Sequence, residues 1–370
     1  MIKKVLVLIL TLTFAVGAFG QSLEETLGNM LGDNATMYVQ PLGDGMGSLM
    51  NSGYYHRSRV HKMLGFDISV KMMGLQVDDE SKFFDFSLGE GNLVFDMNEV
   101  TDAYGDLGSI TIPFADTYDA STPVPTIAAD KEDVGTVAVK DADIIGLISD
   151  QLLSALTAEL GNATDAQLAV SSLSPEIATA VAALPDISFT GLGLNTLALP
   201  VPQIALGLPM GIELTLRGLP EFDFGDEYGK FTMYGGGARI NIDQFIPIPL
   251  FPVDITAGAF YSQMSIGDIF TSTNTTVNLQ VGKSLSLLFF GLGVYADAGY
   301  ESSAIDIKYE IPESAGLGVE EVSFGMETDP GLRLGAGLHL TFIPLTYFNL
   351  HVSQTPNNSV VTAGFGISLR

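Results

Sequence analysis

The sequence has no cysteine, few basic residues and, beyond its first twenty residues, no long apolar run. Without cysteine there is no disulfide framework, no thiolate metal or redox site and no cysteine to carry a lipid. Asp and Glu total 43 against 16 Lys and Arg, a formal charge of −27, which opposes contact with a phosphate backbone and excludes nucleic acid as a partner. No later segment approaches the roughly 18 apolar residues of a membrane-spanning helix.

The chain is nevertheless oily, with 46% hydrophobic and 16% charged residues and a mean hydropathy of +0.32. Residues 1–20 place Lys3 and Lys4 before an apolar run and end in small residues, which predicts a signal peptide that is cleaved on export. Backbone polar groups in lipid must be paired within the protein, so a membrane protein without spanning helices has to close its strands into a barrel.

The last forty residues alternate between apolar side chains and small or polar ones, which is the pattern of strands. The intervening positions carry mostly Gly, Ser, Thr and Asn, whereas a soluble sheet usually carries Lys and Glu on its wet face. The runs are about ten residues long, which matches a tilted strand that crosses a bilayer. The apolar row therefore faces lipid, and in the first of these runs it comprises Leu332, Leu334, Ala336, Leu338, Leu340 and Phe342.

The same alternation predicts a closed antiparallel transmembrane β-barrel of about twelve strands, with ten to fourteen left open. Apolar, proline-containing turns after residues 245 and 342 contrast with acidic connections, so we place the former in the periplasm and the latter outside. Residues 288–342 form a hairpin too long for the bilayer, which projects from the outer surface. The expected strands cover 64–72, 84–95, 108–114, 206–217, 234–243, 253–262, 277–281, 288–311, 322–342, 348–353 and 361–369.

Two segments interrupt the strand pattern. Residues 21–59 begin with a short helix capped by Ser22 and continue through an irregular stretch at 41–47, and we expect this segment to plug the lumen, with a periplasmic position as the alternative. Residues 117–185 place Ile144, Ile148, Leu152 and Leu156 at helical spacing and start a second helix at Ser174, which predicts an extracellular helical insert. The barrel then comprises the rest of 60–370. The plug candidates are Leu27, Leu31, Pro41 and Gly43.

The sequence offers little for catalysis, because it has no nucleophile elbow, paired-His zinc motif or P-loop. We therefore expect neither an enzyme nor a cofactor. His339 and His351 lie on neighbouring lumen rows, but they suit ordinary lumen residues better than a metal site. Opposite charges on the lumen rows would either seal the pore or line a polar channel. The lumen-lining candidates are Glu213, Arg217, Arg239, Asp243, Asp254, Asp297, Glu301, Asp306, Lys308, Arg333, His339 and His351.

Residues 40–43, Gln-Pro-Leu-Gly, occupy the place where the fatty-acid (hydrophobic-compound) transporters of Gram-negative outer membranes carry Asn-Pro-Ala in an N-terminal hatch. The chain resembles that family in this motif and in its long outer strands. Its C-terminus is similar to a barrel-assembly signal, with Phe365, Ile367 and Leu369 alternating, although Arg370 replaces the usual closing aromatic residue. This resemblance implies an outer-membrane location, with membrane lipid, lipopolysaccharide and the barrel-assembly machinery as partners.

Two functions follow from this sequence interpretation. The first is porin-like, passive passage of a small apolar or amphipathic solute, because an apolar helical insert and a filled lumen suit a hydrophobic small molecule. The second is a structural or surface-interaction barrel that does not transport, whose lumen is sealed by ion pairs.

Overall fold

The computed structural model describes residues 33–88, 92–96, 108–182, 184, 186–223, 230–247, 252–267, 270–287, 290–310, 321–343 and 345–369. They form two compact units, one of residues 39–82 and 193–370 and the other of residues 25–38 and 83–192, as far as these are described. No helix among the described residues is long and apolar enough to cross a membrane.

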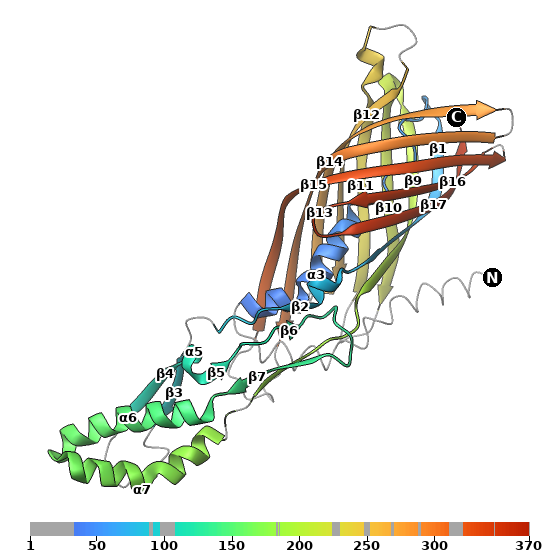
Figure 1. Cartoon of the computed structure of the whole chain (residues 1–370). Coiled ribbons are helices and arrows are strands. Elements are labelled where there is room, and N and C mark those ends of the chain that lie inside the picture. The colour runs from blue at the N-terminus through green and yellow to red at the C-terminus, as the bar shows by residue number, and fades with distance from the viewer. Residues whose placement is uncertain are drawn as a thin grey trace. The chain divides into compact units, whose positions relative to one another are not determined.

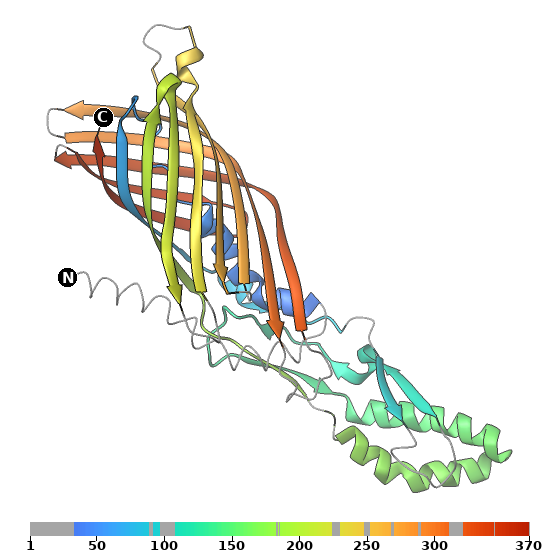
Figure 2. The same cartoon turned by 180° about the vertical axis from the view of Figure 1, so that it is seen from behind.

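The first unit is a closed antiparallel barrel (Figures 1 and 2). Its ten strands follow in the order β1-β17-β16-β15-β14-β13-β12-β11-β10-β9, and β9 pairs again with β1. We call the end at which β1 begins and β17 ends the inner end, and the opposite end the outer end. The strands are β1 (Phe66–Gln76), β9 (Thr196–Leu208), β10 (Ile212–Asp223), β11 (Lys230–Asn241), β12 (Asp254–Ile266), β13 (Phe270–Leu287), β14 (Phe290–Glu310), β15 (Glu321–Ile343), β16 (Thr346–Gln354) and β17 (Ser359–Leu369).

The apolar side chains of the barrel wall face outward and the polar ones face inward, which is the reverse of a soluble protein. On β1, Ile68 is 56% exposed whereas Lys71 is fully buried, and the same alternation continues around the wall. Outward-facing Tyr234, Tyr261 and Tyr300 lie near one level of β11, β12 and β14, as in the aromatic girdles of membrane barrels. From Phe290 to Tyr300 the strand spans about 25 Å along the barrel axis, at about 3.3 Å per residue and a tilt of about 40°. This distance equals the apolar band of such barrels.

The projecting hairpin is present as β14 and β15, which stay paired out to Glu310 and Glu321. Beyond the girdle the side-chain pattern inverts, because Ile305 is 2% exposed inside while Asp306 is exposed outside. Out of the bilayer the outer face meets water, and the inner face packs on α3 (Asp33–Met50), where a Cβ on Gly43 would lie 3.0 Å from the Ile305 side chain. The placement of Asp306 in the lumen is therefore wrong, since the strand keeps its alternation while its surroundings change.

The barrel has ten strands, whereas eleven stretches were expected as strands, and two differences account for this. The stretches expected as strands at 84–95 and 108–114 form short ladders in the second unit instead of barrel strands. The stretch 206–217 is a hairpin, in which β9 ends at Leu208 and β10 starts at Ile212. Its three-residue turn, η2 (Pro209–Gly211), keeps even-numbered residues outward on both strands, so the apolar alternation passes through the turn without interruption.

The second unit contains two packed helices, α6 (Asp141–Leu160) and α7 (Ala163–Ala182), joined where Gly161 adopts a left-handed conformation. The four predicted apolar positions of α6 are all buried, against Val170, Leu173, Ile177 and Val181 of α7. Ser174 does not start a helix, because the buried stripe carries α7 from Ala163 through Pro175. The rest comprises β2 (Phe83–Phe84), β3 (Asn92–Asp96), β4 (Ser109–Pro113), α5 (Phe114–Thr117), β5 (Tyr118–Asp119), β6 (Val124–Pro125), β7 (Val134–Val139) and β8 (Ile187–Thr190).

The unit that contains these helices is wider than the expected insert at 117–185, since it takes in all of 83–192 and the stretch before Val39. It is also strongly acidic, because the only basic side chains in 83–192 are Lys131 and Lys140. Two short 3₁₀ turns complete the described elements, η1 (Asp79–Lys82) after β1 and η3 (Asp243–Phe245) after β11.

Candidate functional site

The inside of the barrel is occupied by residues 39–65, which we call the lumen segment. It consists of the second part of α3 and the chain that leads into β1, and α3 is the blue helix in Figure 1. The stretch 41–47, expected to be irregular, is helical despite Pro41, because it packs against β14 and β15. Pro41 and Gly43 are both buried there, whereas Leu27 and Leu31 lie outside the described residues.

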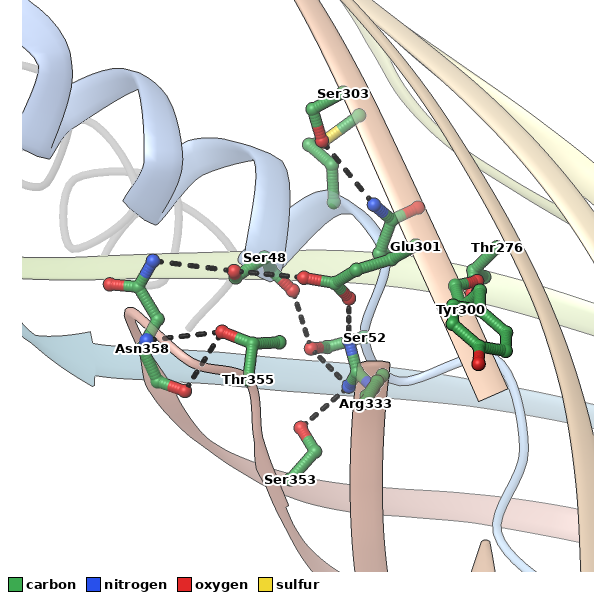
Figure 3. Close-up of polar contacts among 12 residues, drawn as sticks. Ser48, Ser52, Thr276, Tyr300, Glu301, Ser303, Arg333, Ser353, Thr355 and Asn358 are labelled. Carbon is green, nitrogen blue, oxygen red and sulfur yellow. Dashed lines mark hydrogen bonds and ion pairs between the residues drawn. The ribbon is translucent and has the colours of Figure 1, made fainter. Parts of the chain in front are cut away.

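Near the outer end, the lumen segment joins a network on β14, β15 and the β16–β17 hairpin (Figure 3). Ser48 donates to the Glu301 carboxylate at 3.0 Å. Arg333 donates to the other Glu301 oxygen at 2.6 Å, to the Ser52 hydroxyl at 2.7 Å and to Ser353 at 2.6 Å. A buried charge pair thus fixes the end of α3 to two strands of the wall.

Half-way down, two tyrosines of the segment fill the lumen. Tyr54 stacks on Phe260 with ring centroids 4.2 Å apart, and Tyr55 donates to the Asp297 carboxylate at 2.5 Å. His351 lies 3.0 Å from the same carboxylate. Tyr55 is therefore a donor to a carboxylate that it shares with His351.

At the inner end, Glu213 is the centre of the contacts. It accepts from Arg239 at 2.5 Å and from both the backbone N–H and the ring Nδ1 of His61, at 2.8 and 2.7 Å. Arg239 also donates to the backbone carbonyl of Arg57 at 2.8 Å. Gly207 makes room for this packing, because a Cβ there would collide with the carbonyls of His61 and Lys62.

His56 also packs inside the barrel. It stacks on Tyr347 at 4.2 Å and lies 5.0 Å from the ring of His339.

The wall itself is interrupted between β9 and β10. The ladder that joins them runs from the Leu208–Ile212 pair to the Gln203–Arg217 pair and ends there. Beyond this point, in the described chain, β9 pairs only with β1 and β10 only with β11. We call this divergence the fork. Gly218 is the first residue of β10 without a partner on β9, and on its other side it pairs with Tyr234 of the girdle on β11. The fork therefore opens at the outer edge of the apolar band.

Prolines explain why the ladder stops. The N–H and C=O of Gly207 both bond toward β1, so odd-numbered residues of β9 direct their backbone groups to β1 and even-numbered residues direct theirs to β10. Pro200 and Pro202 therefore lack the N–H groups that β9 would offer to β10. If the register continued, Pro220 of β10 would lie opposite Pro200, and it also lacks a donor.

The fork is closed from within by the lumen segment. Arg217 donates to the backbone carbonyls of Met50 and Ser52, the latter at 2.6 Å, and its guanidinium lies 3.5 Å above the ring of Tyr54. Gln203 donates to the Tyr54 carbonyl at 3.0 Å. Gln203 and Arg217, the last paired residues before the fork, thus hold Met50, Ser52 and Tyr54 of the chain behind it.

Outside the fork the lipid-facing surface is hollowed. The hollow has a volume of about 490 Å³ and an almost wholly apolar lining from β17, β1, β9 and β10. Two of the residues that line it, Gln203 and Arg217, each carry a buried polar atom. These atoms, Gln203 Oε1 and Arg217 Nε, have no hydrogen-bond partner among the described residues. The other lining residues are Ile68, Ser69, Val70, Pro202, Ile204, Leu216, Gly218, Phe365, Gly366 and Ile367.

The structure brings most of the lumen candidates together but not all. Asp243 lies in η3 at an inner turn, off the lumen row, because β11 has already ended, and Asp306 faces outward as described above. The Lys308 side chain lies outside what is described. No group of three or more His, Asp or Glu side chains in the described residues could hold a metal. Buried within the barrel are Glu213, Arg217, Arg239, Asp254, Asp297, Glu301, Arg333, His339 and His351.

Sequence reasoning missed Gln203 and the three prolines of the fork. The signal was present, since Pro200, Pro202 and Pro220 interrupt stretches with strand alternation, and proline in a strand indicates an unpaired edge. Lys71, which alternation also predicts on a lumen row, is fully buried and donates to Asn349 at 2.9 Å.

Comparison with known proteins gives a family but no function. A family model described as "Family of unknown function (DUF6588)" matches residues 1–369. No curated protein matches the chain. Among solved structures, a KdgM porin in complex with disordered oligogalacturonate is similar at 8% identity and a TM-score of 0.22, over 46% of this chain and 93% of that one.

Two further solved structures are similar over most of this chain. The CymD monoaromatic hydrocarbon channel has 10% identity and a TM-score of 0.18, over 89% of this chain and 96% of that one. A BenF-like porin from Pseudomonas fluorescens Pf-5 has 8% identity and a TM-score of 0.13, over 82% and 98%. Likenesses at these TM-scores carry no functional argument.

Proposed function

Because the chain belongs to a family of unknown function, DUF6588, its role has to be argued from its own geometry, and we propose that it is an outer-membrane barrel for the passive passage of a small apolar or amphipathic solute. The solute passes between lumen and bilayer through the fork, and the lumen segment is the plug that closes this path. Membrane lipid and lipopolysaccharide surround the barrel, and the barrel-assembly machinery inserts it.

The membrane location is supported by the exposed apolar rows and the girdle, because isolated aliphatic side chains are common on soluble proteins but a continuous apolar band of about 25 Å is not. Inside, the charged residues are buried, and Glu213, Glu301 and Asp297 each lie in an ion pair or a carboxylate–histidine contact, which is the opposite of a soluble barrel. The acidic connections face outward in this orientation, away from the inner turns.

The observation that carries the transport proposal is the fork. The ladder between β9 and β10 ends at the outer edge of the apolar band, beyond which backbone groups can reach water or a solute instead of a partner strand. The end of the ladder coincides with an apolar hollow and with two buried polar atoms, Gln203 Oε1 and Arg217 Nε, that have no hydrogen-bond partner among the described residues. An amphipathic solute would place its apolar body in the hollow and its polar group against these atoms.

Uptake of a small apolar dye into liposomes that contain the protein tests this proposal. The variant Pro200→Val/Pro202→Val/Pro220→Val restores the missing donors, so β9 and β10 can pair beyond Arg217, and uptake should fall to that of protein-free liposomes. Pro247→Val, in an inner turn, is the matched control and should leave uptake unchanged. Equal uptake by both variants would contradict passage through the fork.

The second candidate, a barrel that does not transport, is favoured by a different observation. The lumen segment is hydrogen-bonded to the wall from Ser48 to His61, and its charged partners are buried. Single-channel recording of the intact chain separates the two functions, because a permanently sealed barrel gives no conductance. A second test deletes residues 21–59 or removes the insert at 117–185. Uptake unchanged by those deletions would also count against the transport proposal.

A further inference from the structure

The lumen segment runs through the barrel in one direction, which can be followed on β14. Along the segment, Gly43 lies against Ile305, Ser48 bonds to Glu301 and Tyr55 bonds to Asp297. The partner numbers fall steadily toward Phe290, where β14 begins at the inner end. The segment is therefore antiparallel to β14, with Val39 toward the outer end.

The other end of the segment confirms this direction. The ring of His61 lies 3.0 Å from the Ser368 hydroxyl, and Leu64 donates from its backbone N–H to Gly207 at 2.9 Å. Ser368 is next to the last residue of β17, and Gly207 is next to the last residue of β9, and both of these strands end at the inner end. The chain thus traverses the whole lumen before β1 starts.

A separate set of contacts holds the residues before Val39. Asn34 donates to the backbone carbonyl of Ser87 at 2.6 Å and accepts from the Ser87 N–H at 2.8 Å. Tyr38 donates to the Thr190 carbonyl at 2.8 Å, and its own carbonyl accepts from the N–H of Ile127 at 3.0 Å. Ser87, Ile127 and Thr190 all belong to the second unit, and the chain enters residues 83–192 from the outer end of β1 and leaves them into the outer end of β9.

From the direction of the lumen segment and the contacts of Asn34 and Tyr38, we propose that the chain before Val39 leaves the barrel at its outer mouth. It is then displayed on the cell surface together with the acidic second unit. The inference rests on the orientation in the proposed function, but the pairing of the N-terminal stretch with the insert does not. An extracellular partner would then meet both chain segments at once. The lumen segment is also anchored at both ends, so it cannot leave the barrel as a body toward the periplasm.

The absence of cysteine makes the test direct, because each introduced thiol is unique. Three single variants at exposed positions report the three places: Gln40→Cys at the outer mouth, Leu168→Cys on α7 and Met63→Cys before β1. Intact cells are treated with a polymer-coupled maleimide too large to cross the outer membrane, then permeabilised and treated again. Heat-modifiable migration verifies that each variant is folded.

The expected result is that Gln40→Cys and Leu168→Cys react on intact cells, while Met63→Cys reacts only after permeabilisation. If Gln40→Cys and Met63→Cys both react only after permeabilisation while Leu168→Cys reacts on intact cells, the inference is overturned and the proposed orientation stands. Reaction of Met63→Cys alone on intact cells would overturn both the surface display and the proposed orientation. An epitope tag placed between Gln21 and Ser22 gives a second readout, since antibody should bind it on intact cells.

Discussion

Replacement of Arg217 by methionine tests whether the lumen segment is a gate. Methionine keeps an unbranched aliphatic stem but ends about where the arginine Nε lies, so it cannot donate to the carbonyls of Met50 and Ser52 or lie over the Tyr54 ring as the guanidinium does. The perturbation removes these two hydrogen bonds to the segment, the cation–π contact with Tyr54, a hydrogen bond to Ser262 of the wall at 3.4 Å and one charge. The backbone of the segment loses its attachment at the fork while Gln203 still holds Tyr54.

The size of the effect follows from these contacts. Hydrogen bonds from a charged donor contribute about 1.5–3 kcal/mol each, so two of them give about 3–6 kcal/mol. Part of this is offset, because no carboxylate among the described residues pairs with Arg217, and removal of a buried guanidinium relieves its desolvation. The free energy that favours the docked lumen segment therefore falls by about 2–4 kcal/mol. This corresponds to a rise of roughly 30-fold to 700-fold in the fraction of molecules whose segment is displaced from the fork.

Two readouts measure this fraction. In planar bilayers, channel openings of Arg217→Met should be more frequent than those of the wild-type protein by that factor. In parallel, a thiol introduced by Ser58→Cys, at a position that is buried when the segment is docked, should react faster with a small maleimide. Leu216→Met changes the neighbouring lipid-facing residue and should alter neither readout.

The reasoning fails if Arg217→Met exposes the Ser58→Cys thiol but leaves the conductance at the wild-type level. The segment would then be a filling element rather than a gate. Failure of both readouts to change would instead show that the two carbonyl contacts do not hold the segment, and the assigned magnitude would be wrong.

Three further predictions concern the same segment. Glu213→Gln leaves Arg239 buried without a carboxylate and should lower the free energy of unfolding by about 3–5 kcal/mol, measured as a lower temperature of the heat-modifiable transition. Glu221→Gln, in an exposed pair with Lys230, should leave that temperature unchanged. His56→Ala removes the ring that stacks on Tyr347 at 4.2 Å, so the segment should dock less firmly and openings in planar bilayers should be more frequent than in the wild type. Gly207→Val should expose the Met63→Cys thiol further by displacing residues 61 and 62, while Gly146→Val, where a Cβ meets nothing within 4 Å, should not.

The barrel could be predicted from sequence because lipid on one side and a small polar lumen on the other impose a period of two along each strand. The positions of β1 and of β11 to β17 follow from this alone. The helix around Ile144, Ile148, Leu152 and Leu156 was equally visible, because its apolar residues recur at the helical period and are all buried.

The parts that escaped prediction are those where the surroundings or the connection change without a change in the pattern. The odd-length turn at 209–211 preserves the parity of the apolar row, so two strands looked like one. On β14 the environment inverts beyond Tyr300, so Asp306 looked like a lumen residue when Ile305 was the inward one. The segment at 41–47 contains Pro41 and three glycines, and only packing inside the barrel makes it helical.

The fork has a consequence for the association of barrels with one another. A barrel normally has no strand edges, and edges are where chains of different molecules add to a sheet. The fork restores two short edges at the border of the lipid, where a second barrel could pair with them. Pro200, Pro202 and Pro220 stand on these edges and present no N–H to a neighbour, so the edges that the fork exposes are poor templates for the strand of a second barrel.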